Sequence, residues 1–168
     1  MIADISTDDS AILAEIHRHC FDDHWSAKSF RELLFQDVFF GFICKKEKPY
    51  GFILGKIVCH EIEIITFCTL PELRNRGIGK TLLMKVDDYA AHHFVNDIFL
   101  EVSEDNVIAR KIYKDFGYKE ISRRAGYYQS QNCSKVAIVL QKRNLFCGDT
   151  GEFLRRTAFS VNKNHRLP

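Results

Sequence analysis

The spacing of apolar side chains along the chain predicts a mixture of helices and strands. Apolar residues recur at helical spacing in some segments and form short continuous or alternating runs in others. The expected helices are 7–19, 26–35, 79–93 and 106–116. The expected strands are 2–5, 38–45, 50–59, 61–70, 97–102, 118–124 and 135–140. This order predicts an α/β (α+β) domain, with a mixed, mostly antiparallel sheet flanked by helices on both faces.

The loop between the strand 61–70 and the helix 79–93 has the sequence Arg-Asn-Arg-Gly-Ile-Gly-Lys at 74–80. The first turn of a helix carries unpaired N–H groups and a partial positive charge, and glycine lets backbone approach a phosphate closely. The segment therefore predicts a site for a phosphate-bearing ligand. It is not a Walker A loop, because Arg74 stands where the first glycine belongs. It is not a dinucleotide fingerprint, because Leu82 replaces the third glycine.

The remaining pattern, Arg/Gln-x-x-Gly-x-Gly/Ala after a buried strand, resembles the pyrophosphate loop of the GNAT N-acetyltransferases. A second match follows in the strand 98–102 and the segment 106–118, which resembles the "LEV…N…A…Y…GF" stretch of the RimI-type ribosomal-protein-alanine N-acetyltransferases. The resemblance runs from about Asp22 to about Lys142 and includes His24-Trp25-Ser26 and Tyr127-Tyr128. The departures from the family pattern are His24, Cys68-Thr69-Leu70 and the C-terminal extension.

This resemblance implies the GNAT fold, acetyl-CoA as co-substrate and a set of residue roles. Glu101 is expected to be the general base, and Tyr113 the acid that protonates the departing thiolate. A backbone N–H on the strand around Cys68 is expected to hold the carbonyl oxygen. The residues expected to bind acetyl-CoA are Phe67, Cys68, Thr69, Arg74, Asn75, Arg76, Gly77, Ile78, Gly79, Lys80 and Asn106. The residues expected to contact the acceptor are Trp25, Tyr127 and Tyr128, with the two tyrosines on a loop before the last strand.

The implied reaction is acetyl transfer to the N-terminal α-amino group of a protein, with the alanine N-terminus of ribosomal protein S18 as the expected acceptor. An alternative is a GNAT enzyme that acts on a small amine or on protein lysines. A third reading, of a different class, is a non-catalytic acetyl-CoA-responsive module that docks on RNA.

Composition is that of an ordinary globular protein, with 46% hydrophobic and 27% charged residues. No apolar run reaches the roughly 18 to 20 residues of a membrane span, and no secretory signal is evident at the N-terminus. The scattered cysteines favour a reduced, cytoplasmic protein. We expect a GNAT domain at 1–142 and a basic extension at 143–168, where Lys and Arg outnumber Asp and Glu. That tail is either a solvated end or a weak RNA or ribosome contact.

A cluster of polar residues at 17–24 contains His17, His19, Cys20 and His24 and looks like a metal site. Two histidines separated by one residue do not share a helix face, and no spacing here matches structural zinc. We therefore expect no metal, and interpret His17 and His19 as part of a polar helix end.

Overall fold

The computed structural model describes residues 1–130 and 133–144. Its helices are α1 Ser10–Cys20, α2 Ala27–Leu34, α3 Ile78–His92 and α4 Val107–Asp115, with 3-10 turns η1 Thr7–Asp9 and η2 Pro71–Leu73. Its strands are β1 Ile2–Asp4, β2 Phe39–Lys45, β3 Pro49–Val58, β4 Glu61–Thr69, β5 Asp97–Ser103, β6 Lys119–Ser130 and β7 Cys133–Arg143. The predicted fold class is confirmed.

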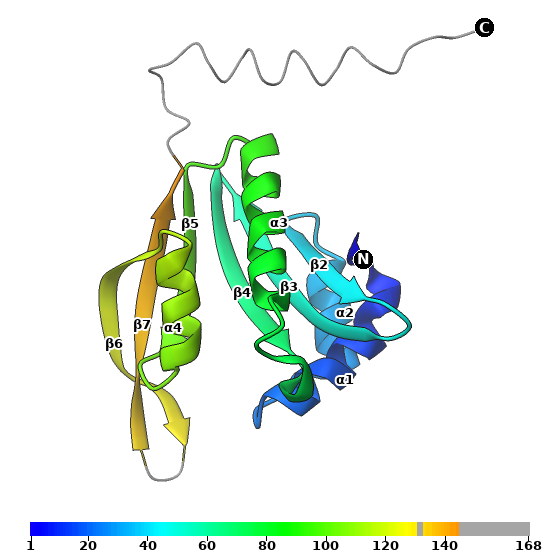
Figure 1. Ribbon diagram of the computed structural model, residues 1–168, viewed down its shortest axis with the longest axis horizontal. Helices are drawn as coiled ribbons and strands as arrows, with labels where there is room; N and C mark the ends of the chain where they lie inside the picture. The colour runs from blue at the N-terminus through cyan, green and yellow to red at the C-terminus, as the bar shows by residue number, and fades with distance from the viewer. Residues whose placement is uncertain (131–132, 145–168) are drawn as a thin grey trace, which may run out of the picture.

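The strands form one sheet in the order β1-β2-β3-β4-β5-β7-β6. Only β4 and β5 run parallel, and every other neighbouring pair is antiparallel. Helices α3 and α4 cover one face, and α1 and α2 cover the other face over β2 to β4 (Figure 1). The larger core lies under α3 and α4, and a smaller core lies under α1 and α2.

The helix ends follow local side-chain chemistry. The Ser26 hydroxyl accepts a hydrogen bond from Ser29 N at 3.1 Å, so Ser26 caps α2 as predicted. The helix expected from residue 7 begins only at Ser10, because the turn η1 occupies Thr7–Asp9. There the Asp9 carboxylate accepts from Ser6 N at 2.8 Å. Gly117 follows α4 with φ +87°, the left-handed conformation that glycine adopts without strain.

The two C-terminal strands are longer than the sequence predicts. The expected loop around Tyr127 and Tyr128 is wrong, since both residues belong to β6. The side chains of 126–135 lie outside the described part of the chain, and so does the segment 145–168 that holds nearly all of the expected basic extension. Strand β7 reaches Arg143, and the domain boundary expected at 142 stays a prediction. No helix in the described part is long and apolar enough to cross a membrane.

His17 is buried, and the interpretation of a polar helix end is wrong for this residue. Its side chain is only 3% exposed, and its Nδ1 accepts a hydrogen bond from Trp25 N at 3.2 Å. The ring stacks on Trp25 at 5.2 Å and contacts Phe30 edge-on. Burial, with a smaller contribution from the charge of His24, lowers the pKa of His17 from 6.5 to about 4. The neutral ring therefore joins α1 to the segment that leads into α2.

We expect this histidine to make the fold acid-sensitive. Its folded pKa lies below its unfolded pKa, so only the unfolded chain gains the proton as pH falls from 6.5 toward 4. The free energy of unfolding should thus drop by about 2 kcal/mol between pH 7.5 and pH 5 because of this one group. Urea denaturation of wild type and His17→Gln at both pH values measures this change in the free energy of unfolding. Exposed His19, bonded to Glu15, provides the control His19→Gln. Equal pH dependence in wild type and His17→Gln would contradict this account.

Candidate active site

The start of α3 forms a cradle of unpaired backbone N–H groups. Thr81 is the first residue of the helix whose N–H bonds to a backbone carbonyl, with 3.0 Å between Thr81 N and Gly77 O. Within the described part of the chain, no hydrogen bond is recorded for the N–H groups of 75–80. Such groups, together with the helix dipole, stabilise an anion. The predicted phosphate loop therefore has the geometry of an anion site.

Two glycines shape this cradle in different ways. Gly77 caps α3 with φ +81°, and a Cβ added there would meet no atom within 4 Å. A Cβ added at Gly79 would lie 3.1 Å from the Phe67 ring. Gly79 thus lets the first turn of α3 pack against β4. Gly77 keeps the approach to the cradle open, in a backbone conformation that suits glycine best.

The cations of the loop point in different directions. Arg76 and Lys80 are exposed beside the cradle, where they can neutralise a phosphate. Arg74 instead donates from Nε to the carbonyl oxygen of Thr69 at 3.2 Å, which turns it toward the end of β4. Of the predicted cations, Arg74 is the least available to a ligand at the start of α3.

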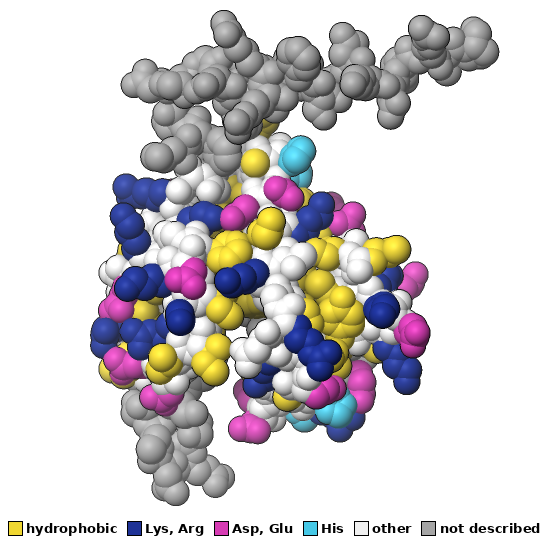
Figure 2. Space-filling model, viewed as in Figure 1, with side chains coloured by type: hydrophobic (Ala, Val, Ile, Leu, Met, Phe, Trp, Pro, Cys, Tyr) yellow, Lys and Arg dark blue, Asp and Glu magenta, His cyan; other side chains and the backbone are white. Residues whose placement is uncertain are grey.

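Strands β4 and β5 separate at the end of the sheet next to this cradle. Their pairing runs only from Glu61 with Asp97 to Ile64 with Leu100, and beyond it the strands diverge (Figure 1). In the space-filling view a notch opens at the lower edge, between the part built around α4 and the part built around the start of α3 (Figure 2). Past Ile64, no strand in the described part of the chain pairs with the edge of β4 that faces β5, so backbone groups on that edge can meet a ligand.

A bulge in β4 decides which side chains border this gap. Leu54 pairs with Thr66 and Gly55 pairs with Ile64, so Ile65 is an extra residue in the strand. Phe67 consequently faces α4, with its ring 6.2 Å from Tyr113. The Cys68 side chain faces the opposite way, into the core under α1 and α2. Any contact from Cys68 to a ligand on the α3 side would have to come from its backbone.

Three buried hydroxyl groups have no hydrogen-bond partner among the described residues. They are Thr66 Oγ1 on β4, Ser103 Oγ on β5 and Tyr118 Oη after α4. Buried polar groups are normally satisfied, and exceptions point to a missing water or ligand. Thr66 and Ser103 lie on the two strands that diverge, and both oxygens are enclosed by protein.

Glu101 lies on β5 beside the gap. Leu100 and Val102 are buried under α3 and α4, so the alternation of the strand turns Glu101 to the opposite face. Its Oε1 lies 2.8 Å from Arg124 Nη1, and its side chain is 23% exposed. The carboxylate is therefore held in place by Arg124 and remains accessible to solvent water.

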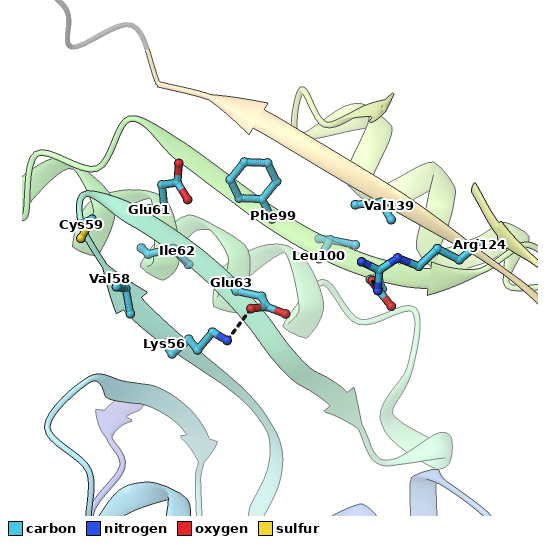
Figure 3. Close-up of a pocket in the computed structure, with 11 residues that line it drawn as sticks. Lys56, Val58, Cys59, Glu61, Ile62, Glu63, Phe99, Leu100, Arg124 and Val139 are labelled. Carbon is cyan, nitrogen blue, oxygen red and sulfur yellow. Dashed lines mark ion pairs between the residues drawn. The ribbon is translucent and has the colours of Figure 1, made fainter. Parts of the chain in front are cut away.

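The same face carries a shallow pocket of about 310 Å³ (Figure 3). Phe99 and Val139 contribute apolar surface, and Lys56 pairs with Glu63 across its rim at 2.7 Å between Nζ and Oε2. Glu101 and Arg124 both line this pocket, and Arg124 lies at the end where β4 and β5 diverge (Figure 3). The base candidate thus sits at an accessible surface.

Tyr113 lies on the other face of the sheet, on α4. It is 6% exposed and packs against Phe67 and Tyr118. Burial raises its pKa well above the usual value for tyrosine, so the hydroxyl keeps its proton at neutral pH. The sheet thus carries an ion-paired carboxylate on one face and a protonated phenol on the other.

The remaining predicted residues come from α4, the segment before α2, and β6. Asn106 caps α4, and its Oδ1 accepts from Ala109 N at 3.1 Å, which leaves its amide N–H₂ available to a ligand. Trp25 lies at the start of α2, half-buried against His17. Tyr127 and Tyr128 are placed only by their backbone in β6. Their expected contact with the acceptor stays a prediction.

These residues fit a ligand that joins a pyrophosphate to a reactive carbonyl. The cradle at 75–80 suits the pyrophosphate, and the gap between β4 and β5 suits a slender arm that reaches from it. Strand-edge N–H groups of β4 past Ile64 border the place where the carbonyl would end. Among the described residues, no group of three His, Cys, Asp or Glu side chains is arranged to hold a metal ion.

Sequence reasoning missed Thr66, Ser103 and Arg124. Arg124 meets Glu101 although β7 lies between their strands. The strand order β5-β7-β6 departs from the order along the chain, so no local sequence pattern could predict this contact. Thr66 and Ser103 read as ordinary strand residues. They stand out only in the structure, because they lie on the two strands that diverge and have buried hydroxyls without a partner among the described residues.

Comparisons with known proteins agree with this geometry. The sequence model of the acetyltransferase (GNAT) family matches residues 11–118. The chain is similar to the [ribosomal protein bS18]-alanine N-acetyltransferase of Salmonella typhimurium, with 24% identity over 83% of this chain and 94% of that protein.

Solved structures show the same fold. The ribosomal-protein-S18-alanine N-acetyltransferase of Escherichia coli superimposes with a TM-score of 0.83 at 23% identity, covering 89% of this chain and 96% of that chain. Arabidopsis thaliana NAA60 in complex with acetyl-CoA superimposes with a TM-score of 0.75 at 20% identity, covering 85% of this chain and 97% of that chain.

Proposed function

The chain belongs to the GNAT acetyltransferase family, and on that premise we propose that it transfers the acetyl group of acetyl-CoA to the N-terminal α-amino group of a protein. The proposed acceptor is the alanine N-terminus of ribosomal protein S18. One observation supports the catalytic part: beside two diverging strands, the sheet has an ion-paired carboxylate on one face and a buried phenol on the other. The names of the relatives support the choice of acceptor.

The cofactor is held by the residues of the cradle and the gap. The N–H groups of 75–80, with Arg76 and Lys80, bind the pyrophosphate, and Phe67 lines the arm on the α4 side. Acetyl-CoA supplies an activated thioester carbonyl. Backbone N–H groups on the free edge of β4 hold its oxygen as negative charge develops there.

Glu101 removes the proton from the attacking amine, directly or through one water. An α-amino group has a pKa near ~8, against about 10.4 for lysine. Deprotonation at pH 7 therefore costs about 1 kcal/mol for an N-terminus and roughly 4 to 5 kcal/mol for a lysine. A single solvent-accessible carboxylate is therefore sufficient to deprotonate an N-terminal amine. Tyr113, whose hydroxyl stays protonated, gives its proton to the departing thiolate.

The acceptor lies on the face that carries Glu101. Trp25 at the start of α2 and Tyr127 and Tyr128 in β6 form walls against the peptide, on either side of the gap. A cytoplasmic location fits a ribosomal acceptor. We propose a catalytic domain over about 1–142, with the basic segment after it as an accessory that contacts the ribosome weakly.

The test is incubation of the full-length protein with acetyl-CoA and a set of amines, read by mass spectrometry. We expect acetylation of the N-terminal hexapeptide of S18 and of other peptides that begin with a small residue. The matched control is the same hexapeptide with a blocked α-amine and an added internal lysine, which should stay unmodified. Acetylation of a small polyamine or of the internal lysine, with no peptide N-terminus modified, would establish the alternative acceptor class.

A further inference from the structure

Two cysteines outside the proposed mechanism meet where α1 ends against β4. Cys20 is the last residue of α1 and is half-buried, and Cys68 on β4 is 7% exposed. Both belong to the small core under α1 and α2. The Cys20 thiol lies 3.5 Å from the carbonyl oxygen of Thr69, the residue after Cys68. The thiols are also close enough that each shifts the pKa of the other.

We propose that Cys20 and Cys68 are an oxidative modification site, at which a two-electron oxidant of the hydroperoxide class forms a reversible disulfide. Both side chains pack into the same small core in the reduced protein, and the Cys20 sulfur lies beside the residue that follows Cys68. One of them is reachable from solvent, and the other is enclosed. This combination gives an attacking sulfur that meets the oxidant and a resolving sulfur that is held beside it.

The surroundings favour Cys20 as the sulfur that reacts first. The hydrogen bond from the Cys68 thiol, helped by the nearby Arg74 guanidinium, lowers the pKa of Cys20 to about 7. The pKa of Cys68 is raised, because it shares that hydrogen bond and is buried. A substantial fraction of Cys20 is thus thiolate at neutral pH, and thiolate is the reactive form.

The reaction balances with the peroxide as the only co-reactant. The Cys20 thiolate attacks one oxygen of hydrogen peroxide, the O–O bond breaks, and the departing hydroxide takes a proton to become water. Cys20 is then a sulfenic acid. The Cys68 sulfur attacks the Cys20 sulfur, the S–O bond breaks, and the hydroxide leaves as water with the proton lost from Cys68. Two thiols and one peroxide give one disulfide and two waters.

Closing the bond must move the end of α1. A disulfide has an S–S length of about 2.05 Å, well below the separation of two thiols in contact. Cys20 therefore shifts toward β4 and carries the following segment, which holds Trp25, with it. Trp25 stacks on His17 at 5.2 Å and is the single tryptophan of the chain, so its fluorescence reports the shift. This readout does not depend on the proposed function.

The chain offers a matched control in Cys59, an exposed free thiol at the turn after β3. Trypsin leaves Cys59 and Cys68 together on the peptide 57–74, whereas Cys20 lies on the peptide 19–28. The assignment is therefore made in full-length Cys59→Ser protein. In that background, Cys20→Ser removes the attacking sulfur, and Cys68→Ala removes the resolving one.

The reduced proteins are treated with hydrogen peroxide, alkylated and digested without reduction. We expect a crosslink between peptides 19–28 and 57–74 in the Cys59→Ser background, lost on treatment with dithiothreitol and absent in both double variants. Tryptophan emission should change in parallel with the crosslink. Independent alkylation or over-oxidation of Cys20 and Cys68 without a crosslink would overturn the pairing. A complete crosslink with unchanged tryptophan emission would overturn the inferred movement of α1.

Discussion

Glu101→Gln is expected to lower kcat at pH 7 by about 10²- to 10⁴-fold, the range for loss of a general base. The KM for acetyl-CoA should change little, because the residue acts on the acceptor amine. The loss should be largest at low pH, where most of the amine is protonated, and should shrink as pH rises past about 8. Steady-state rates on an alanine-terminal peptide between about pH 6.5 and 9 measure both effects.

Two variants isolate this role. Glu63→Gln removes an exposed carboxylate from the same face, together with its ion pair to Lys56 at 2.7 Å, and should leave kcat within about twofold. Tyr113→Phe removes a hydroxyl to which the described residues give no hydrogen-bond partner, so the fold should tolerate it. It should lower kcat without rescue at high pH, since it acts on the leaving group. If Glu101→Gln retains the wild-type pH–rate profile, Glu101 is not the general base, and an ordered water accepts the proton from the amine instead.

Gly77→Val is expected to weaken acetyl-CoA binding by at least about 100-fold, or about 2.7 kcal/mol. The reason is local, because a Cβ at Gly77 would occupy the open space beside the N–H cradle. The left-handed φ of +81° adds backbone strain of about 1 to 2 kcal/mol. Isothermal titration calorimetry gives the affinity, and thermal unfolding gives the strain.

Gly117→Val controls for the strain. Gly117 has φ +87° and the same open surroundings, but it follows α4 instead of preceding α3. Its substitution should lower the melting temperature about as much as Gly77→Val and leave the affinity for acetyl-CoA unchanged. Equal affinities in folded Gly77→Val and wild type would place the pyrophosphate elsewhere.

Periodicity and glycine placement predicted most of the elements but not the faces of every strand. The helix 79–93 was recognisable from its apolar stripe, and α3 at Ile78–His92 confirms it. Strand β4 was also predicted, yet its run Ile64-Ile65-Thr66 has no alternation that could reveal a bulge. The face of Cys68 therefore could not be assigned. The burial of His17 could not be predicted either, because it depends on a contact with α2.

The C-terminal strands show a second limit. Polar residues and Gly126 near 126–132 are typical of a loop, but β6 continues through Ser130. Pairing with β7 overrides the weak local preference, because strand propensity depends on the neighbouring strand. The pairing of Glu101 with Arg124 across β7 was invisible for the same reason. The catalytic candidates themselves were predictable only through the family resemblance.

The position of β7 has a consequence for how the protein is made. Although β7 is the last strand of residues 1–144 along the chain, it lies inside the sheet, between β5 and β6. Until its residues leave the ribosome, one edge of β5 has unpaired N–H and C=O groups along Asp97–Ser103. Such an open edge is a template for pairing with another chain. A nascent or truncated chain that lacks 133–143 is thus exposed to aggregation. Rapid synthesis of residues 133–143 after β5 shortens the time for which this edge is open.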